Sequence, residues 1–116
     1  MVVRVKIDGR HEAAMIFDTG ASSVAITRSL ANRLNLDLSQ ARTFYVATAS
    51  GVAMARRVRL ESVALGSARV SQVRAAVVPS MGTDGDIEGL LGNSFLSQFK
   101  VQVDSQKGQI ILSQND

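Results

Sequence analysis

The chain is organised around the stretch Met15-Ile16-Phe17-Asp18-Thr19-Gly20-Ala21-Ser22. Its first three residues are continuously apolar, which is typical of a strand buried on both faces. An ionisable side chain directly after such a strand is costly unless it is paired or hydrogen-bonded. A turn is the simplest interpretation, because Asp and Gly are common where strands end. A bare Asp-Thr-Gly is expected by chance in roughly a few per cent of chains of this size, so its meaning depends on its surroundings.

The residues around this stretch predict a mainly β fold. Val3, Val5 and Ile7 alternate with polar residues, as in a half-buried strand, and Asp8-Gly9 predicts a hairpin. The return strand is expected over about 12–17. Further strands are expected from composition and alternation at 24–26, 44–48, 52–60, 62–65, 70–78, 101–103 and 109–112. Among these, 44–48 and 52–60 form one expected hairpin, and 62–65 and 70–78 form another.

Two short helical segments interrupt the strands. Thr27 has the character of an N-cap, and Leu30 and Leu34 lie one helical turn apart behind it, so we expect a short helix near 28–35. A helical turn is expected near 94–99, and residues 79–86 form a loop by composition. Many short strands with one helix predict a small barrel or sandwich.

Length and composition exclude several classes of protein. The chain has 116 residues, which is enough for one domain with a core of its own. It has no Cys and one His, so disulfides, cysteine zinc sites, thiol nucleophiles and multi-histidine metal sites are excluded. Its apolar runs are too short to span a bilayer, and we expect no membrane contact within this segment.

The net charge of +3 comes from thirteen basic residues, of which ten are Arg. These residues are scattered, and the cluster Arg56, Arg57 and Arg59 is expected to be an exposed strand face. Aromatic residues make up 4% of the chain, too few for a stacking platform for single strands, so no nucleic-acid partner is expected. A basic nucleic-acid-binding β domain is the weakest of three alternatives. No metal site is expected either, because the spacing of Asp84, Asp86 and Glu88 does not match an EF-hand.

At this point the sequence resembles the retropepsin-like aspartic proteases, and more closely the bacterial single-domain members of that clan. The resemblance covers nearly the whole chain. It rests on the Asp18-Thr19-Gly20-Ala21 loop, the hairpin tip Thr48-Ala49-Ser50-Gly51 and the element Leu90-Leu91-Gly92 before a short helix. It implies a closed antiparallel β-barrel in a single domain over 1–116.

The resemblance also implies an activity, that of an aspartic endopeptidase. In that chemistry two carboxylates share one proton and activate a water molecule, without metal or cofactor. Because this chain carries one Asp-Thr-Gly, the dyad requires a homodimer with one Asp18 from each subunit, acting on a peptide or protein substrate. The resemblance gives roles to the remaining site residues: Thr19, Gly20, Ala21 and Ser22 in the active-site loop, Thr48, Ala49, Ser50 and Gly51 as a flap, and Leu90, Leu91 and Gly92 as loop support.

Three further expectations follow from the same resemblance. Ser22 and Ser23 stand where retroviral members often carry an acidic residue, which changes how the substrate main chain is held. A catalytically silent peptide-binding module on the same fold is the alternative function. Bacterial relatives often have an N-terminal anchor; if one precedes this segment, the protein is membrane-tethered or periplasmic. By analogy with the family, the dimer closes through sheet contacts between chain ends.

Overall fold

The computed structural model describes residues 1–48, 51–81 and 85–114. Within them the chain forms strands and two short helices in the order β1 (Val2–Ile7), β2 (His11–Phe17), β3 (Val24–Thr27), α1 (Arg28–Arg33), β4 (Arg42–Thr48), β5 (Gly51–Leu65), β6 (Ala68–Val78), β7 (Ile87–Leu91), α2 (Asn93–Leu96), β8 (Phe99–Asp104) and β9 (Gln109–Gln114). No helix in this part of the chain is long and apolar enough to cross a membrane.

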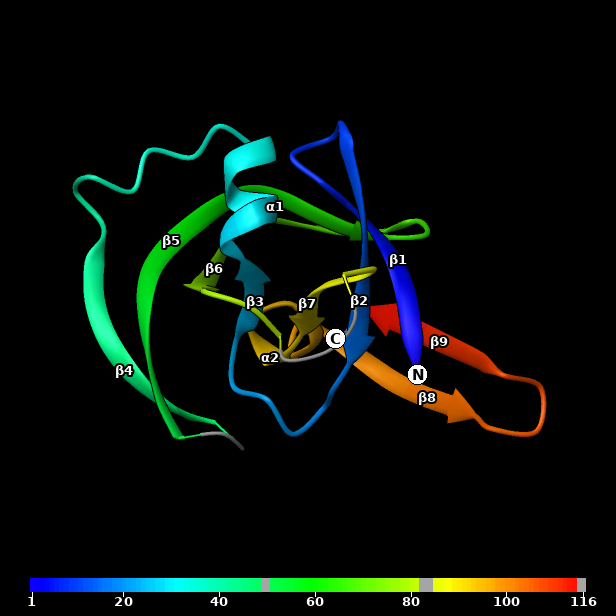
Figure 1. Cartoon of the computed structure of the whole chain (residues 1–116). Coiled ribbons are helices and arrows are strands. Elements are labelled where there is room, and N and C mark those ends of the chain that lie inside the picture. The colour runs from blue at the N-terminus through cyan, green and yellow to red at the C-terminus, as the bar shows by residue number, and fades with distance from the viewer. Residues whose placement is uncertain (49–50, 82–84, 115–116) are drawn as a thin grey trace.

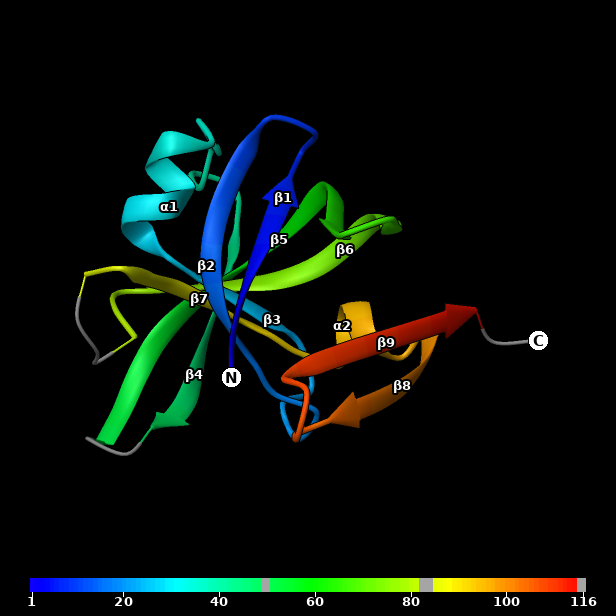
Figure 2. The same ribbon diagram turned by 90° about the vertical axis from the view of Figure 1, so that its right-hand side faces the viewer.

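Six strands close into a barrel, as the resemblance implied (Figure 1). Their order is β1-β2-β7-β3-β6-β5, and β1 pairs with β5 through Lys6–Ala64 and Ile7–Val63 to complete the ring. Most pairings are antiparallel, but β2–β7 and β3–β6 are parallel. β4 extends the sheet beyond β5, and β8 and β9 form a separate two-stranded sheet beside the barrel (Figure 2).

One expected boundary was wrong, and the two expected helical segments are confirmed with slightly shorter bounds. The strands expected at 52–60 and 62–65 are one continuous strand, β5, because Glu61 and Ser62 stay in the sheet and donate their backbone N–H groups to Asp8 Oδ1. Helix α1 ends at Arg33 rather than near 35, since Asn35 takes a left-handed conformation with φ 57°. The helical turn expected at 94–99 is α2, over Asn93–Leu96, and Phe99 already begins β8.

The barrel interior is filled by apolar side chains that alternate along the strands. Val5 and Ile7 of β1 are buried while Arg4 and Lys6, which alternate with them, are exposed, as period-2 patterning requires. Helix α1 covers one end of the core with Leu30, and the expected cap is confirmed, since Thr27 Oγ1 accepts a hydrogen bond from Leu30 N at 3.1 Å. Helix α2 contributes the buried side chains of Phe95 and Leu96.

Candidate active site

Asp18 follows the last residue of β2 and is half-buried. Its backbone N–H donates to the carbonyl of Leu91 at 3.1 Å, so the loop begins in contact with the end of β7. Its Oδ1 accepts a hydrogen bond from Gly20 N at 2.9 Å, which fixes the orientation of the carboxyl group. A Cβ atom at residue 20 would lie 3.3 Å from Oδ1, tighter than an ordinary contact, so glycine suits this position.

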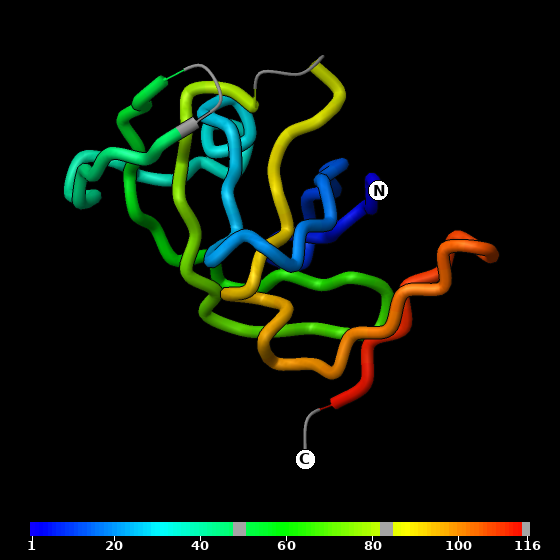
Figure 3. Tube along the Cα trace, turned by 90° about the horizontal axis from the view of Figure 1, so that it is seen from below, coloured from blue at the N-terminus to red at the C-terminus, as the bar shows by residue number. Residues whose placement is uncertain are grey.

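The loop after Asp18 is held in place by the junction between β7 and α2. Asn93 donates its backbone N–H to the carbonyl of Ala21 at 2.9 Å and its side-chain Nδ2 to the carbonyl of Thr19 at 2.7 Å. Gly92 packs so closely that a Cβ atom there would lie 2.3 Å from the carbonyl oxygen of Ser23. Segments about seventy residues apart in the chain are thus joined side by side (Figure 3).

The structure places the three expected support residues at different depths. Leu91 is fully buried in the core, Gly92 is buried against the loop, and Leu90 is half-buried beside an open cleft. Sequence reasoning missed Asn93, which makes two hydrogen bonds to the loop, one from its backbone and one from its side chain. The available signal was an amide side chain directly after Leu-Leu-Gly at the start of a helical turn.

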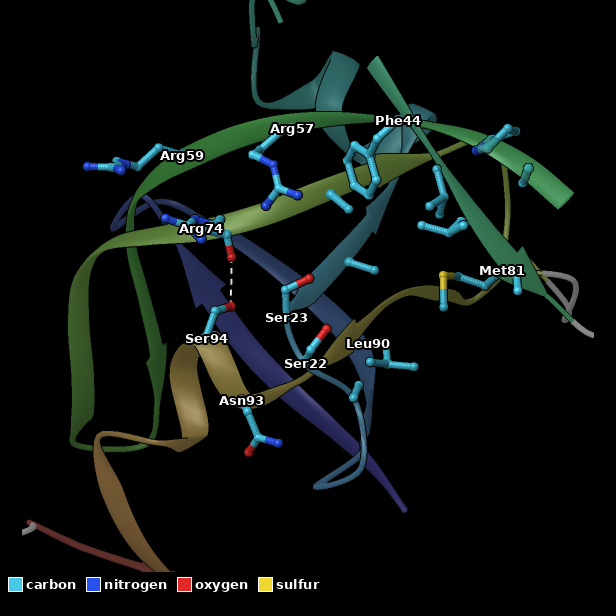
Figure 4. A pocket seen from close by; sticks show the side chains of 18 of the residues that line it. Ser22, Ser23, Phe44, Arg57, Arg59, Arg74, Met81, Leu90, Asn93 and Ser94 are labelled. Atoms are coloured by element: carbon cyan, nitrogen blue, oxygen red, sulfur yellow. Dashed lines mark hydrogen bonds between the residues drawn. The ribbon is translucent and has the colours of Figure 1, made fainter. Parts of the chain in front are cut away.

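Ser94 is a second residue that the sequence did not single out. Its hydroxyl accepts a hydrogen bond from Val24 N at 2.8 Å and donates one to the carbonyl of Arg74 at 2.6 Å (Figure 4). The hydroxyl therefore ties α2 to β3 and to β6 at once. These contacts fix the position of α2 relative to β6, and both elements contribute residues to the cleft described next.

A cleft of 1410 Å³ opens beside the Asp18 loop. Loop residues Ala21, Ser22 and Ser23 line one side of it, whereas Thr19 and Gly20 are exposed outside the lining. The opposite wall comes from β4, β5 and β6 and is largely apolar. The cleft is larger than the roughly 300–1,000 Å³ of typical small-molecule sites, so it has room for an extended chain segment.

The hairpin of β4 and β5 borders this cleft. Its last described pair is Thr48 with Gly51; the expected tip residues Ala49 and Ser50 lie outside the described residues. Phe44 and Val46 face the cleft, while Tyr45 on the same strand is 72% exposed. The hairpin is thus positioned beside the cleft, with apolar side chains on both of its faces.

The arginine cluster divides between two faces of β5. Arg56 is half-buried and donates from Nη1 to the carbonyl of Leu38 at 2.8 Å. Arg57 and Arg59 are exposed, as expected, but they line the cleft, and Arg74 of β6 joins them there. The sequence did not predict this meeting, because Arg74 lies on another strand and strand pairing alone places it opposite Arg59.

The ionic surroundings of the loop are simple. Within residues 1–48, 51–81 and 85–114 the structure has one ion pair, between Arg33 and Glu88, and it does not involve Asp18. No group of three His, Asp or Glu side chains in these ranges is placed to hold a metal ion. The loop carries the Asp18 carboxylate, whose orientation is fixed by Gly20 N and which stands three to five residues before the loop residues that line the cleft.

Comparison with known proteins agrees with this arrangement. The model of the family described as gag-polyprotein putative aspartyl protease matches residues 3–98. A crystal structure of a retropepsin-like aspartic protease from Rickettsia conorii superposes with a TM-score of 0.73 at 29% identity, covering 97% of this chain and 88% of that one. A protein of Sinorhizobium sp, described as an uncharacterized protein in cobV 5'region, is 33% identical over 96 residues. That match covers 82% of this chain and 40% of the relative, so the chain spans less than half of the relative's length.

The family match includes the Asp18 loop, the β4–β5 hairpin and the β7–α2 junction, each of which contributes residues to the lining of the cleft. The fold agrees over almost the whole chain with that of a retropepsin-like protease. This chain is therefore a member of the gag-polyprotein putative aspartyl protease family and has a retropepsin-like fold.

Proposed function

We propose that this protein is an aspartic endopeptidase that hydrolyses peptide bonds at a dyad made of two Asp18 carboxylates. Two carboxylates held close together cannot both ionise, so they share one proton and titrate as a pair. One carboxylate takes a proton from a water molecule held between them. The other donates its proton to the oxygen of the scissile carbonyl as the water attacks the carbon.

The observation that carries this proposal is the fixed carboxyl of Asp18, which is not itself a lining residue of the cleft but belongs to the loop whose residues Ala21, Ser22 and Ser23 line it. Its orientation is set by Gly20 N, and its loop is held by Leu91 and Asn93. In the proposed dyad, the Asp18 carboxyls of the two subunits must both lie within hydrogen-bond distance of one water molecule. Such restraint is needed because a small misplacement of either carboxyl lowers the rate by a large factor. Family membership supplies the second line of support.

The proposal requires a homodimer, since the chain holds one Asp-Thr-Gly. We propose a single domain over residues 1–116 that provides half of a symmetric enzyme, with the two Asp18 loops meeting at the two-fold axis. Thr19 is exposed in the isolated chain, and its hydroxyl would hydrogen-bond to the partner's backbone across that axis. The monomer alone is expected to be inactive.

Substrate would bind in the cleft as an extended peptide. Its main chain would pair with the loop at Ala21 and Ser22 and with the β4–β5 hairpin, as in strand addition. The hairpin, with its tip at 48–51, would act as a flap that closes over the peptide and excludes water. Leu90 and the apolar wall of the cleft would contact substrate side chains.

The test is digestion of a diverse peptide mixture, followed by mass spectrometry across acid to neutral pH and at several protein concentrations. Wild type is compared with Asp18→Asn and with Asp37→Asn, which removes a carboxylate outside the cleft. We expect cleavage by wild type and by Asp37→Asn, with a specific activity that rises with concentration as dimers form. Asp18→Asn should lose at least about a thousandfold in rate, because no dyad remains.

Each contrary result has a defined meaning. Cleavage that survives Asp18→Asn would reject the dyad. If the specific activity stays constant as the protein is diluted to concentrations at which it is monomeric, a site shared between two subunits would be rejected. Absence of cleavage by a confirmed wild-type dimer, together with peptide binding in the cleft, would favour the catalytically silent peptide-binding module instead.

A further inference from the structure

Three arginine side chains line one end of the cleft. Arg57 and Arg59 come from β5 and Arg74 comes from β6. In Figure 4 they lie together on the side away from Met81, and Ser22 and Ser23 of the Asp18 loop lie between the two ends. No Asp or Glu is found among the described residues that line the cleft. The cleft therefore has a strongly positive end.

The arrangement of these arginines is unfavourable for the sheet by itself. Arg59 and Arg74 are direct cross-strand partners, and both face the cleft. Like charges in directly opposed positions destabilise a sheet. Within the described ranges no carboxylate forms an ion pair with either residue, so only solvent screens the repulsion there. Such an arrangement is stabilised when an anion binds between the two guanidinium groups.

The surrounding residues hold the cluster in position. The Arg57 guanidinium lies over the ring of Phe44, 4.6 Å from its centroid, so its plane is supported. The backbone of Arg74 is anchored by the hydrogen bond from Ser94 Oγ to its carbonyl. Gln72, which also lines the cleft, has φ 57°, an uncommon conformation for a residue other than glycine. A site held on paired strands has less freedom to lose when a ligand binds.

The cleft favours a polypeptide anion over a nucleic acid. Phe44 is the one aromatic residue among its described lining, and Arg57 covers a face of that ring, so the described lining has no row of aromatic rings on which successive bases could stack. Apart from Gln72, the rest of the opposite wall is apolar and suits aliphatic side chains. Carboxylates match the planar fork of a guanidinium and bind it through paired hydrogen bonds.

We propose that Arg57, Arg59 and Arg74 form an anion-binding subsite that selects peptide segments with an aspartate or glutamate side chain. The inference rests on the proposed function of the cleft as a peptide-binding site, and it adds a substrate class. Selected substrates carry apolar residues near the Asp18 loop and an acidic residue further along the bound segment, in reach of the three guanidinium groups.

Binding to the 116-residue chain with the substitution Asp18→Asn tests this subsite without requiring catalysis. The probes are two fluorescently labelled peptides with the same apolar centre, one flanked by glutamates and the other by glutamines. At low salt we expect the glutamate peptide to bind about tenfold more tightly, since each exposed charge pair contributes a modest share. The preference should fall to about twofold or less in Arg59→Gln/Arg74→Gln. It should persist in the matched variant Arg10→Gln/Arg28→Gln, whose arginines are exposed and lie outside the cleft.

A stability measurement separates a binding role from a structural one. Arg59→Gln removes the repulsion between cross-strand partners, so its thermal midpoint should be equal to or above that of the parent protein. A structural role for Arg59 would instead lower both the midpoint and the affinity. The exchange Arg59→Glu/Arg74→Glu should reverse the preference toward a lysine-flanked peptide, which provides a second test if the glutamine variants bind weakly.

Several outcomes would overturn the inference. Equal binding of the glutamate and glutamine peptides, including no binding of either, rejects the subsite, as does a preference that survives Arg59→Gln/Arg74→Gln. Tighter binding of an oligothymidylate of equal charge would assign the cluster to nucleic acid. Failure of the proposed function can be told apart from failure of the subsite. If wild-type protein cleaves neither peptide but binds the glutamate peptide more tightly, the protease proposal alone is rejected. If it cleaves both peptides with equal kcat/KM, the subsite alone is rejected.

Discussion

Gly92 is a residue at which a single added carbon atom should disturb the site. Its backbone has φ −110°, which any residue adopts, so alanine meets no conformational strain there. The obstacle is steric, because a Cβ atom would lie 2.3 Å from the carbonyl oxygen of Ser23 and 3.0 Å from that of Ala21. Both contacts are to backbone, which moves less readily than a side chain. The loop that carries Asp18 must therefore shift to accept any side chain.

We predict that Gly92→Ala lowers the free energy of unfolding by about 1–3 kcal/mol, as overpacking of a close contact does. At a temperature where the variant is still folded, the rate of peptide cleavage should fall by more than the loss of folded protein explains. The reason is that Ala21 and Ser23, which the added Cβ atom displaces, border the cleft. Urea denaturation and digestion assays measure the two effects. Gly85→Ala is the control, since a Cβ atom at residue 85 meets nothing within 4 Å. An unchanged stability in Gly92→Ala would show that the loop adapts freely.

The β1–β2 turn and strand β5 show how one side chain joins separate elements. Asp8 has φ 54° and Gly9 has φ 73°, so the turn uses two left-handed residues. Asp8 Oδ1 accepts hydrogen bonds from Glu61 N at 2.9 Å and from Ser62 N at 3.3 Å, and Asp8 N donates to the Ser62 carbonyl at 2.9 Å. These contacts lie next to the β1–β5 pairing that closes the barrel.

We predict that Asp8→Ala destabilises the protein by about 1–3 kcal/mol, because alanine is strained at positive φ and leaves two amide groups without their acceptor. Asp8→Asn should lose less than half as much, since asparagine tolerates the same conformation and keeps a carbonyl oxygen. Denaturant midpoints and hydrogen exchange at Glu61 and Ser62 report the effect. Equal losses in both variants would indicate that the charge of Asp8, rather than its geometry, closes the barrel.

At the scale of the whole molecule, the sheet of β8 and β9 is the element expected to form the dimer. It has two strands, so each strand has an outer edge without a partner strand in the described part of the chain (Figure 2). Such edges pair readily with another chain. Val103 and Ile111 are 50% and 47% exposed on this sheet. Leu112, by contrast, packs against the core of the barrel.

We predict that removal of Gln109–Asp116 weakens dimerisation, and that Val103→Ser/Ile111→Ser weakens it by about tenfold or more while the barrel stays folded. Sedimentation equilibrium measures the dimer constant, and circular dichroism checks the fold. The point variant is needed because truncation also removes Leu112 from the core. Unchanged sedimentation of both proteins would place the dimer interface elsewhere.

Much of the fold could be predicted from local patterns. Alternation at Val3, Val5 and Ile7 predicts β1, and Thr27 predicts the start of α1, because side-chain burial and capping depend on neighbouring residues. The continuity of β5 could not be predicted, since it depends on Asp8, more than fifty residues away. The Asp18 loop was identified from its sequence, but the contacts of Asn93 to it were not, because they join segments distant in the chain.

The sequence by itself determined the chemical groups: one Asp-Thr-Gly after an apolar strand, no Cys, and thirteen basic residues. These facts follow from residue identity and short-range periodicity alone. The tertiary structure decided which of those groups meet. It placed Asn93 on the Thr19 carbonyl and Arg74 opposite Arg59, and it put both arginines in the cleft that the Asp18 loop borders. The physical reason is that strand pairing and register fix contacts between segments of the chain that carry no local signal for each other.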